Sequence, residues 1–340
     1  MTKSAKKNVS AKKIISIISD AANILVTGHI RPDGDSIGCM IALVRLLSGA
    51  GIKAVATAEK KDLGGPGFLD GVKQLITPHA ATRQNFDLII TVDCGSLDRV
   101  PEELHGKLEK CIVINIDHHQ TNTRFGDYNF VHATASSTAE MVWKLSRRAG
   151  WKLDNVCAEA LWVALITDTG RFAYDMTTPL TMRCAADLLR YGVRTSYIND
   201  QLYCSFSRVN IELKRRAFRS LVITDRNHIA SVTLTGADFE ETGGTKADAE
   251  DIIEIPRSLV NNKVALFFYG CEDYGETRIS LRTRAPLDAT ALIAQFDGGG
   301  HSRAAGCVIK EPLSKAKRIM NRAIKVWLAE QMSAGTTDSL

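Results

Sequence analysis

Acidic and histidine side chains follow four separate apolar runs of this sequence, each at the point where the run ends. They are His29, Asp33, Asp35, Asp93, Asp117, His118, His119 and Asp168. Because the carboxyl ends of neighbouring parallel strands meet at one edge of a sheet, these side chains are expected to converge. Carboxylates gathered at a half-buried edge repel one another and lose hydration, and divalent cations relieve both costs. The pattern therefore predicts a metal centre.

The types of ligand indicate which metals the site would bind and which class of reaction it would catalyse. Taken singly, Asp35 also fits a helix N-cap and Asp168 a helix end, but such local roles do not explain why so many acids gather. Carboxylates with imidazoles and no thiolate suit Mn²⁺, Mg²⁺, Fe²⁺ or Co²⁺ better than structural zinc. The ligands suffice for two cations about 3.5–4 Å apart, which together generate hydroxide and neutralise a phosphoryl group. Phosphoester hydrolysis is the favoured reaction, with Mn²⁺ preferred and Mg²⁺ or Co²⁺ as alternatives.

The first half of the chain alternates strands with helices. Short β-branched runs predict strands at 23–29, 52–57, 86–93 and 111–117. Apolar residues at helical spacing predict helices at 35–48, 135–148, 155–166 and 181–189. Strands separated by helices indicate an α/β domain, built on a parallel sheet whose two faces are covered by helices.

The second half changes to shorter, hairpin-like strands, which predicts a smaller α+β domain. Strands are expected at 221–224, 229–233, 264–269 and 277–284, and helices at 245–251, 288–295 and 314–331. The resulting domains are a catalytic domain over 1–194, whose first 19 residues form an N-terminal arm and the start of a helix, a charged linking helix over 195–220, a substrate-binding domain over 221–332 and a disordered tail over 333–340.

Length and composition exclude several classes of protein. A chain of 340 residues exceeds the roughly 250–300 residues at which single cores stop growing. No run approaches the roughly 18 apolar residues of a membrane span. Eight scattered cysteines without a Cys-x-x-Cys pair predict reduced thiols and a cytoplasmic location. A net charge of +5 suits an anionic substrate such as a nucleotide but falls short of a genomic DNA-binding protein.

At the level of motifs, the sequence resembles the DHH phosphoesterase superfamily. The motifs, in the superfamily's order, are Gly28-His-Ile-Arg-Pro-Asp-Gly-Asp-Ser-Ile-Gly38, Val92-Asp-Cys94, Asp117-His-His119 and Thr167-Asp-Thr-Gly170. The run Phe296-Asp-Gly-Gly-Gly-His-Ser-Arg-Ala-Ala-Gly306 is similar to the signature loop of the C-terminal DHH-associated domain. The resemblance covers about residues 20–330. The layout is similar to NrnA-type members, which degrade short oligoribonucleotides (nanoRNA) and dephosphorylate 3'-phosphoadenosine 5'-phosphate to AMP.

This resemblance implies a role for each candidate residue. The implied ligands are His29 and Asp33 for one cation, Asp35, His118 and Asp168 for the other, and Asp93 as the ligand shared by both. His119 is expected to lie against the scissile phosphate, polarising it or protonating the leaving oxygen. Asp117 is expected to accept a hydrogen bond that orients an imidazole.

The resemblance also implies that the second domain binds the substrate. Arg282 and His301 are expected to hold it, because a guanidinium offers a bidentate fork for phosphate. Gly299 and Gly300 let backbone amides approach an anion closely. One departure follows Asp168: relatives commonly carry a Phe-Arg-Tyr-Ser-Asn-Thr type of run, but this chain has Phe172-Ala-Tyr-Asp-Met-Thr177, so an Arg or Asn contact is not expected there.

Other functions compete with this hypothesis. Linear or cyclic dinucleotides are alternative substrates for the same type of centre. A processive single-strand exonuclease is disfavoured, since aromatic residues are only 6% of the chain and form no obvious stacking platform. A non-catalytic RNA- or nucleotide-binding module would predict loss of metal ligands, yet all are present. The expected partners are short single-stranded RNA and nucleotides, with no membrane, and a homodimer is left open.

Overall fold

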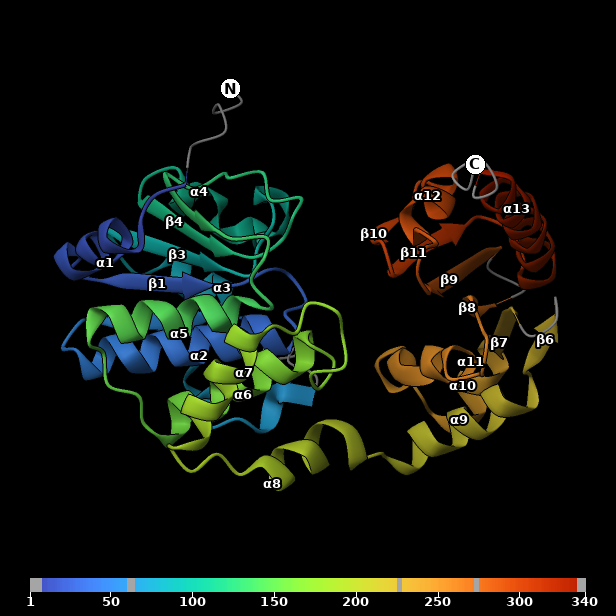
Figure 1. Cartoon of the computed structure of the whole chain (residues 1–340), viewed down its shortest axis with the longest axis horizontal. Coiled ribbons are helices and arrows are strands. Elements are labelled where there is room, and N and C mark those ends of the chain that lie inside the picture. Colours follow the sequence, from blue (N-terminus) through green and yellow to red (C-terminus); the bar gives the residue numbers. More distant parts are fainter. Residues whose placement is uncertain (1–7, 60–64, 225–227, 272–274, 335–340) are drawn as a thin grey trace. The chain divides into compact units, whose positions relative to one another are not determined.

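The computed structural model describes residues 8–59, 65–224, 228–271 and 275–334 and divides the chain into two compact units, Met1–Ser205 and Phe206–Leu340 (Figure 1). The disordered tail was predicted to begin at Ser333, but Ser333 and Ala334 continue the last helix. The rest of that tail, 335–340, and residues 1–7 of the predicted arm lie outside the described residues.

The first unit is built on a five-stranded sheet in which every neighbouring pair of strands is parallel. Its order is β2-β1-β3-β4-β5, with β1 at Ile24–Thr27, β2 at Ala54–Thr57, β3 at Leu88–Val92, β4 at Ile112–Asp117 and β5 at Tyr128–Val131. The predicted parallel α/β fold is confirmed. The sequence analysis missed β5, which has four residues and follows β4 without an intervening helix. The strand order reverses between β1 and β3, where open α/β sheets bind ligands.

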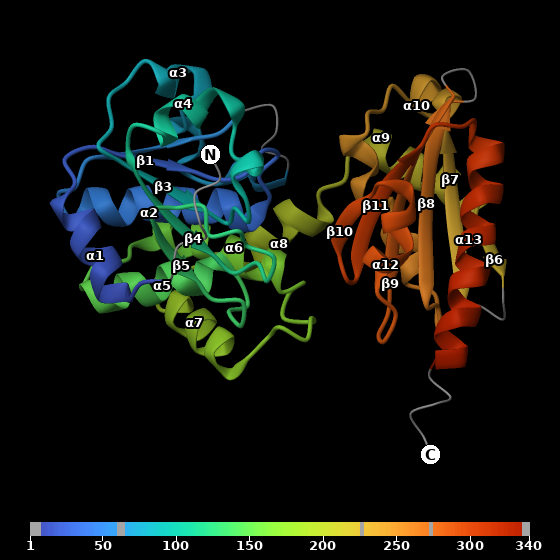
Figure 2. The ribbon, with the colours of Figure 1, turned by 90° about the horizontal axis from the view of Figure 1, so that it is seen from above.

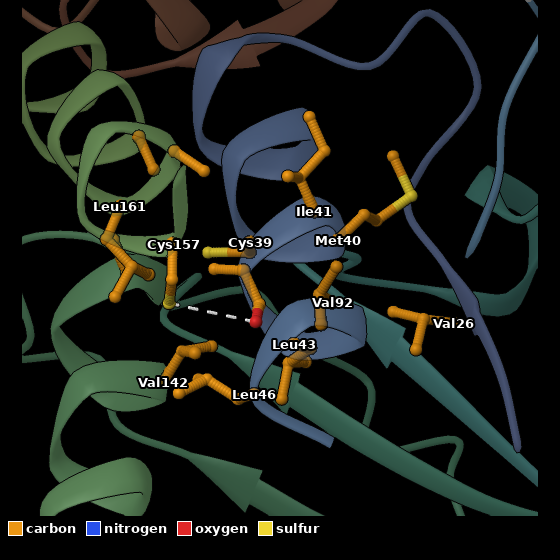
Figure 3. Close-up of a cluster of buried hydrophobic side chains, with 14 of the residues drawn as sticks. Val26, Cys39, Met40, Ile41, Leu43, Leu46, Val92, Val142, Cys157 and Leu161 are labelled. Atoms are coloured by element: carbon orange, nitrogen blue, oxygen red, sulfur yellow. Dashed lines mark hydrogen bonds between the residues drawn. The ribbon is translucent and has the colours of Figure 1, made fainter. Parts of the chain in front are cut away.

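Helices cover both faces of this sheet. One face carries α1 (Ala11–Asp20), α2 (Gly34–Gly49) and α5 (Thr138–Ala149), with α6 (Asn155–Asp168) and α7 (Pro179–Leu189) packed behind them. The other face carries the short helices α3 (Pro78–Thr82) and α4 (His105–Leu108). Figure 3 shows α2 between sheet residues such as Val26 and α6 residues such as Leu161. Because α2 is covered on both sides, it is apolar over most of its circumference.

The predicted linking helix over 195–220 is not continuous. It consists of α8 (Thr195–Asn199), a π-helical turn at Asp200–Cys204 and α9 (Arg208–Arg219). The Ser207 hydroxyl accepts a hydrogen bond from the Asn210 amide at 3.0 Å and so begins α9 as a new helix. Leu213 and Ala217 of α9 are buried in the core of the second unit. The polar helix therefore has an apolar stripe that packs within the second unit.

The second unit contains a six-stranded mixed sheet, in the order β10-β11-β9-β8-β7-β6. Its strands are β6 (Val222–Thr224), β7 (Ile229–Thr235), β8 (Val264–Cys271), β9 (Glu276–Thr283), β10 (Gly299–His301) and β11 (Ala304–Ile309). The hairpin-like arrangement is wrong for β7 and β8, which pair in parallel because α10 (Gly236–Thr242), a 3₁₀ segment (Ala247–Ile253) and α11 (Glu254–Arg257) cross over between them. The glycine run is strand β10, antiparallel to β11, rather than a loop.

Two cores stabilise the second sheet, one on each face. Helices α12 (Ala289–Ile293) and α13 (Leu313–Ala334) pack on one face (Figure 2). Leu266, Leu281 and Cys307 are buried in the core on this face. On the other face α9 and the 3₁₀ segment cover β7 and β8, and Phe267 lies in that core. Among the described helices of the chain, none combines the length and the apolar character needed to cross a bilayer.

An ion pair joins the buried Glu159 of α6 to the exposed Arg194, the residue before α8. The Glu159 side chain is only 3% exposed and accepts hydrogen bonds from the Arg194 guanidinium at 2.7 and 2.6 Å and from the Arg194 amide at 3.0 Å. These bonds lower the pKa of Glu159 below its ordinary value of 4.5. Because the folded-state pKa is the lower one, the stabilisation is complete above pH 4.5 and is lost as the pH falls through the folded-state pKa.

Glu159→Gln is therefore expected to lower the Tm at pH 7 by roughly 3–8 °C. The difference from the wild type should shrink as the pH falls below 4.5, because protonation removes the same charge from the wild-type side chain. Thermal unfolding followed by circular dichroism from pH 3 to pH 8 measures both effects. Glu103→Gln, an exposed glutamate of the same unit, is the matched control. A Tm difference that stays constant across this range would contradict the account.

Candidate metal centre

The carboxyl ends of β1, β3 and β4 position most of the candidate ligands. His29 lies two residues after β1, and Asp93 follows β3 directly. Asp93 has φ 52°, a left-handed conformation that is uncommon outside glycine, and its amide donates to the Ile116 carbonyl at 3.0 Å. Asp117 ends β4, and His118 follows it. The parallel sheet thus brings together residues from three separate motifs.

Two helix N-termini hold the acids of the first motif. Asp33 caps α2, and its Oδ1 accepts hydrogen bonds from the amides of Asp35 at 3.0 Å and Ser36 at 3.1 Å. Asp35 is 1% exposed, and its carboxylate accepts hydrogen bonds from the amides of Thr138 at 2.6 Å and Ala139 at 3.0 Å in the first turn of α5. The partial positive charge of a helix N-terminus favours carboxylates at these positions.

The side chains gather into three overlapping groups, in each of which the potential ligand atoms lie within 4.8 Å of one another. The groups are His29, Asp33 and Asp93; Asp35, His118 and Asp168; and Asp93, His118 and His119. Asp93 and His118 each belong to two of them. The structure therefore brings all six sequence-predicted ligands to one place, and Asp168 reaches it from the end of α6.

The orientation of two imidazoles fits metal ligation. His29 Nδ1 lies 2.8 Å from the Ile30 carbonyl, and His118 Nδ1 lies 3.2 Å from the Ala135 carbonyl. At His118, a proton on Nδ1 satisfies the Ala135 carbonyl and leaves the Nε2 lone pair directed at carboxylates, which is the usual arrangement of metal-bound histidine. His29 Nδ1 also lies 3.1 Å from the Arg99 guanidinium, and its Nε2 faces Asp33 and Asp93. Asp168 Oδ2 lies 3.1 Å from His118 Nε2, yet it is buried and accepts no hydrogen bond from the residues that the structure describes. A cation at this point would satisfy it.

His119 is oriented differently. Its Nδ1 lies 2.6 Å from Asp117 Oδ1, and the other oxygen of Asp117 accepts a hydrogen bond from the Asn122 amide group at 2.5 Å. Asp117 is fully buried, whereas the His119 side chain is 25% exposed. Because its Nδ1 is engaged by Asp117, His119 is less suited to ligation through that atom than His29 or His118 is through Nε2.

Burial and mutual repulsion dominate the electrostatics of the cluster. Burial, followed by the negative charges of neighbouring carboxylates, raises the pKa of Asp35 and of Asp168 well above the usual range. Burial opposes protonation of His29, but the neighbouring carboxylates of Asp33 and Asp93 outweigh this and raise its pKa to about 10. The cluster therefore attracts positive charge strongly, and a divalent cation satisfies the same demand.

Sequence reasoning missed three residues that support the centre. Thr138 donates its hydroxyl to Asp93 Oδ1 at 3.3 Å. Asn122 donates to Asp117 and also to Asn115 Oδ1 at 2.8 Å. Asn122 lies five residues after Asp117, so its proximity to the motif was a signal, but Thr138 lies 45 residues from Asp93 and offered none.

The predicted substrate-binding residues lie in the second unit, on β9 and β10, which flank β11. Strand pairing sets His301 opposite Ala304, and Ala304 opposite Arg282. The side chain of His301 lies outside the described residues. Gly300 has φ 143°, and a Cβ there would lie 2.4 Å from the Ala304 carbonyl oxygen, so only glycine fits. Gly299 has open space around it.

Comparison with known proteins places this fold and site in a defined class. The model of the DHH family, N-terminal domain, matches residues 23–165, and that of the DHHA1 domain matches residues 229–330. The bifunctional oligoribonuclease and PAP phosphatase NrnA of Thermus thermophilus is 30% identical over 297 residues, 84% of each chain. Its namesake from Bacillus subtilis is 28% identical over 306 residues, 87% of this chain and 92% of the relative.

A solved structure shows the same fold. The crystal structure of an exopolyphosphatase-related protein from Bacteroides fragilis aligns with a TM-score of 0.86 at 23% identity, covering 93% of this chain and 96% of that one. The chain is a hydrolase of phosphodiester and phosphomonoester bonds. It belongs to the DHH family and carries the DHHA1 domain in its second unit.

Proposed function

We propose that this enzyme is a two-metal phosphoesterase that hydrolyses short oligoribonucleotides to mononucleotides and 3'-phosphoadenosine 5'-phosphate to AMP. The observation that carries the proposal is the position of Asp93, whose two oxygens approach different histidines. Asp93 Oδ2 lies 3.5 Å from His29 Nε2, and Oδ1 lies 3.8 Å from His118 Nε2. One carboxylate can therefore serve two neighbouring cations. The printed names of the two relatives support the choice of substrates.

The chain's residues divide into two ligand sets. His29 and Asp33 would hold one cation, Asp35, His118 and Asp168 the other, and Asp93 both. We favour Mn²⁺ as the cation. Mg²⁺ and Co²⁺ are alternatives, because mixed carboxylate and imidazole sites accept all three. When bound, the cations neutralise the phosphoryl oxygens and lower the pKa of solvent.

His119 and Asp117 supply the proton chemistry of this proposal. The buried Asp117 carboxylate holds a proton on His119 Nδ1, at a distance of 2.6 Å. Burial opposes protonation of His119, but the bond to Asp117 outweighs it and raises the His119 pKa to about 9. The bond to Asp117 favours the protonated imidazole, which can contact the scissile phosphate and protonate the leaving oxygen. In the second unit, Arg282, His301 and the amides of Gly299 and Gly300 would bind the substrate.

One substrate panel tests the proposal. It contains 3'-phosphoadenosine 5'-phosphate, linear and cyclic dinucleotides, and RNAs of graded length, each assayed with Mn²⁺, Mg²⁺ or Co²⁺. We expect release of mononucleotides from short RNA and of AMP from the bisphosphate, loss of both activities on chelation, and recovery when the cation is added back. Faster turnover of dinucleotides than of every other substrate would replace the proposal with a dinucleotide phosphodiesterase, and no hydrolysis with any cation would refute it.

A further inference from the structure

One face of the second sheet is only partly covered by helices. Arg278, Ser280 and Arg282 of β9 are half-buried and alternate with residues that are buried on the opposite face against α12 and α13. The face on which Arg278, Ser280 and Arg282 lie is the one that α9 covers. The core under α9 takes its strand residues from β7 and β8, and among the described residues none comes from β9, β10 or β11. We call the residues on this side of β9 and β11 the β9 face: Arg278, Ser280, Arg282, Ala304, Gly306 and Val308.

The strand register sets small residues beside Arg282 and Ser280 on the β9 face. Arg282 pairs with Ala304 of β11 and Ala265 of β8, and Ser280 pairs with Gly306. Residues directly opposite on neighbouring strands point to the same side of a sheet. On the β11 side, the half-buried Ala304 and Gly306 leave room beside Arg282 and Ser280 for an extended ligand. Arg278 lies between the larger side chains Val308 and Tyr269.

The two guanidinium groups are held apart. Arg282 donates from Nη1 to the Leu281 carbonyl at 3.0 Å, whereas Arg278 Nε lies 3.5 Å from Glu276 Oε1, toward the opposite end of β9. Arg278 and Arg282 are four positions apart on β9, so their Cα atoms lie about 13 Å apart. This arrangement suits two phosphates of one extended strand. The Arg278 side chain is 40% exposed and its Glu276 partner 47%, so their ion pair is weak and exchangeable.

We propose that the β9 face is a track for the phosphodiester backbone of short RNA, on which Arg278 contacts a phosphate that a nucleoside bisphosphate does not have. The inference rests on the proposed function and makes it more specific. Arg282 belongs to the binding of every substrate, and Arg278 adds affinity only as the RNA lengthens. Charge complementarity selects an anionic backbone as the occupant, and contacts to phosphates carry no information about the bases, so binding is expected to be independent of sequence.

Arg278→Gln tests the track, with 3'-phosphoadenosine 5'-phosphate and a pentaribonucleotide as the two substrates. We expect kcat/KM for the pentaribonucleotide to fall about tenfold, mainly through KM, and its salt slope to fall by about one. The bisphosphate should change less than about twofold. Arg278→Lys should restore part of the loss, and Glu276→Gln should raise pentaribonucleotide affinity by removing a competing negative charge. Arg322→Gln, an exposed arginine of α13, is the control.

Fluorescence anisotropy of a labelled pentaribonucleotide in the presence of chelator separates this inference from the proposed function. If the pentaribonucleotide binds in a way that depends on Arg278 but is not hydrolysed when cations are added, the proposed function is refuted and RNA binding by the β9 face is supported. Equal losses for the two substrates, or no loss for either, would refute the track. A change in oligomeric state of Arg278→Gln, measured by sedimentation, would instead make the β9 face a contact between copies of the chain.

Discussion

Asp93→Asn is expected to reduce hydrolysis of short RNA and of 3'-phosphoadenosine 5'-phosphate by at least about 10³-fold. Asp93 is 3% exposed, and its two oxygens approach His29 and His118, so the amide removes a charged ligand from both sets together. Replacing any ligand that serves one set alone leaves the other set complete. The measurement is initial rate under saturating Mn²⁺ for both substrates.

Metal binding provides a second readout for Asp93→Asn. A hundredfold excess of Mn²⁺ over its Kd is expected to raise the wild-type Tm by roughly 5–10 °C, and this rise should be mostly lost in the variant. Asp20→Asn, an exposed aspartate at the end of α1, is the matched control and should retain both the rise and the activity. Full activity in a folded Asp93→Asn protein would contradict the shared-ligand proposal.

His119→Gln is expected to lower kcat by about 10²–10⁴-fold while leaving the Mn²⁺-induced rise in Tm nearly intact. The reason is geometric: the Nδ1 atom of His119 lies 2.6 Å from Asp117, and the ring is 25% exposed at the edge of the cluster. Its loss therefore removes a proton donor rather than a ligand. KM should change little, because the residues proposed to bind the substrate lie on strands of the second unit.

Asp117→Asn refines this prediction, because it removes the charge that keeps His119 protonated but leaves the side-chain shape. Its kcat should fall in the same direction, and the alkaline limb of the pH–rate profile should move to lower pH. His79→Gln, an exposed histidine of α3, serves as the control. If His119→Gln instead abolished the Mn²⁺-induced rise in Tm, His119 would be a ligand, as its grouping with Asp93 and His118 allows.

Four of the five strands of the first unit could be predicted because each is a short β-branched run, which is a local signal, in a region that also has helices of recognisable period. Strand β5 was missed, because it has four residues and follows β4 without an intervening helix. The second unit was less predictable. Whether β7 and β8 pair in parallel depends on the crossover between them, and the glycine run became β10 because β11 offered it an antiparallel partner. Neither pairing can be predicted from the residues of one strand alone.

The candidate site also has one part that could be predicted from the sequence and another that could not. That acids and histidines gather at one edge followed from sequence, because each comes directly after an apolar run and parallel strands end together. What each one does depended on contacts with distant residues. Asp35 is held by the first turn of α5, more than a hundred residues away, and Asp93 by Thr138.

The order and chemistry of the ligands were thus determined by the sequence alone, since side-chain type and position after a strand are local properties. The resemblance implied different roles for the adjacent residues His118 and His119, but only the tertiary structure gives a physical reason for the difference. One imidazole binds the Ala135 carbonyl and directs Nε2 at Asp168, whereas the other binds Asp117. The partner of each ring nitrogen comes from the folded environment, and that partner decides whether an imidazole offers a lone pair or a proton.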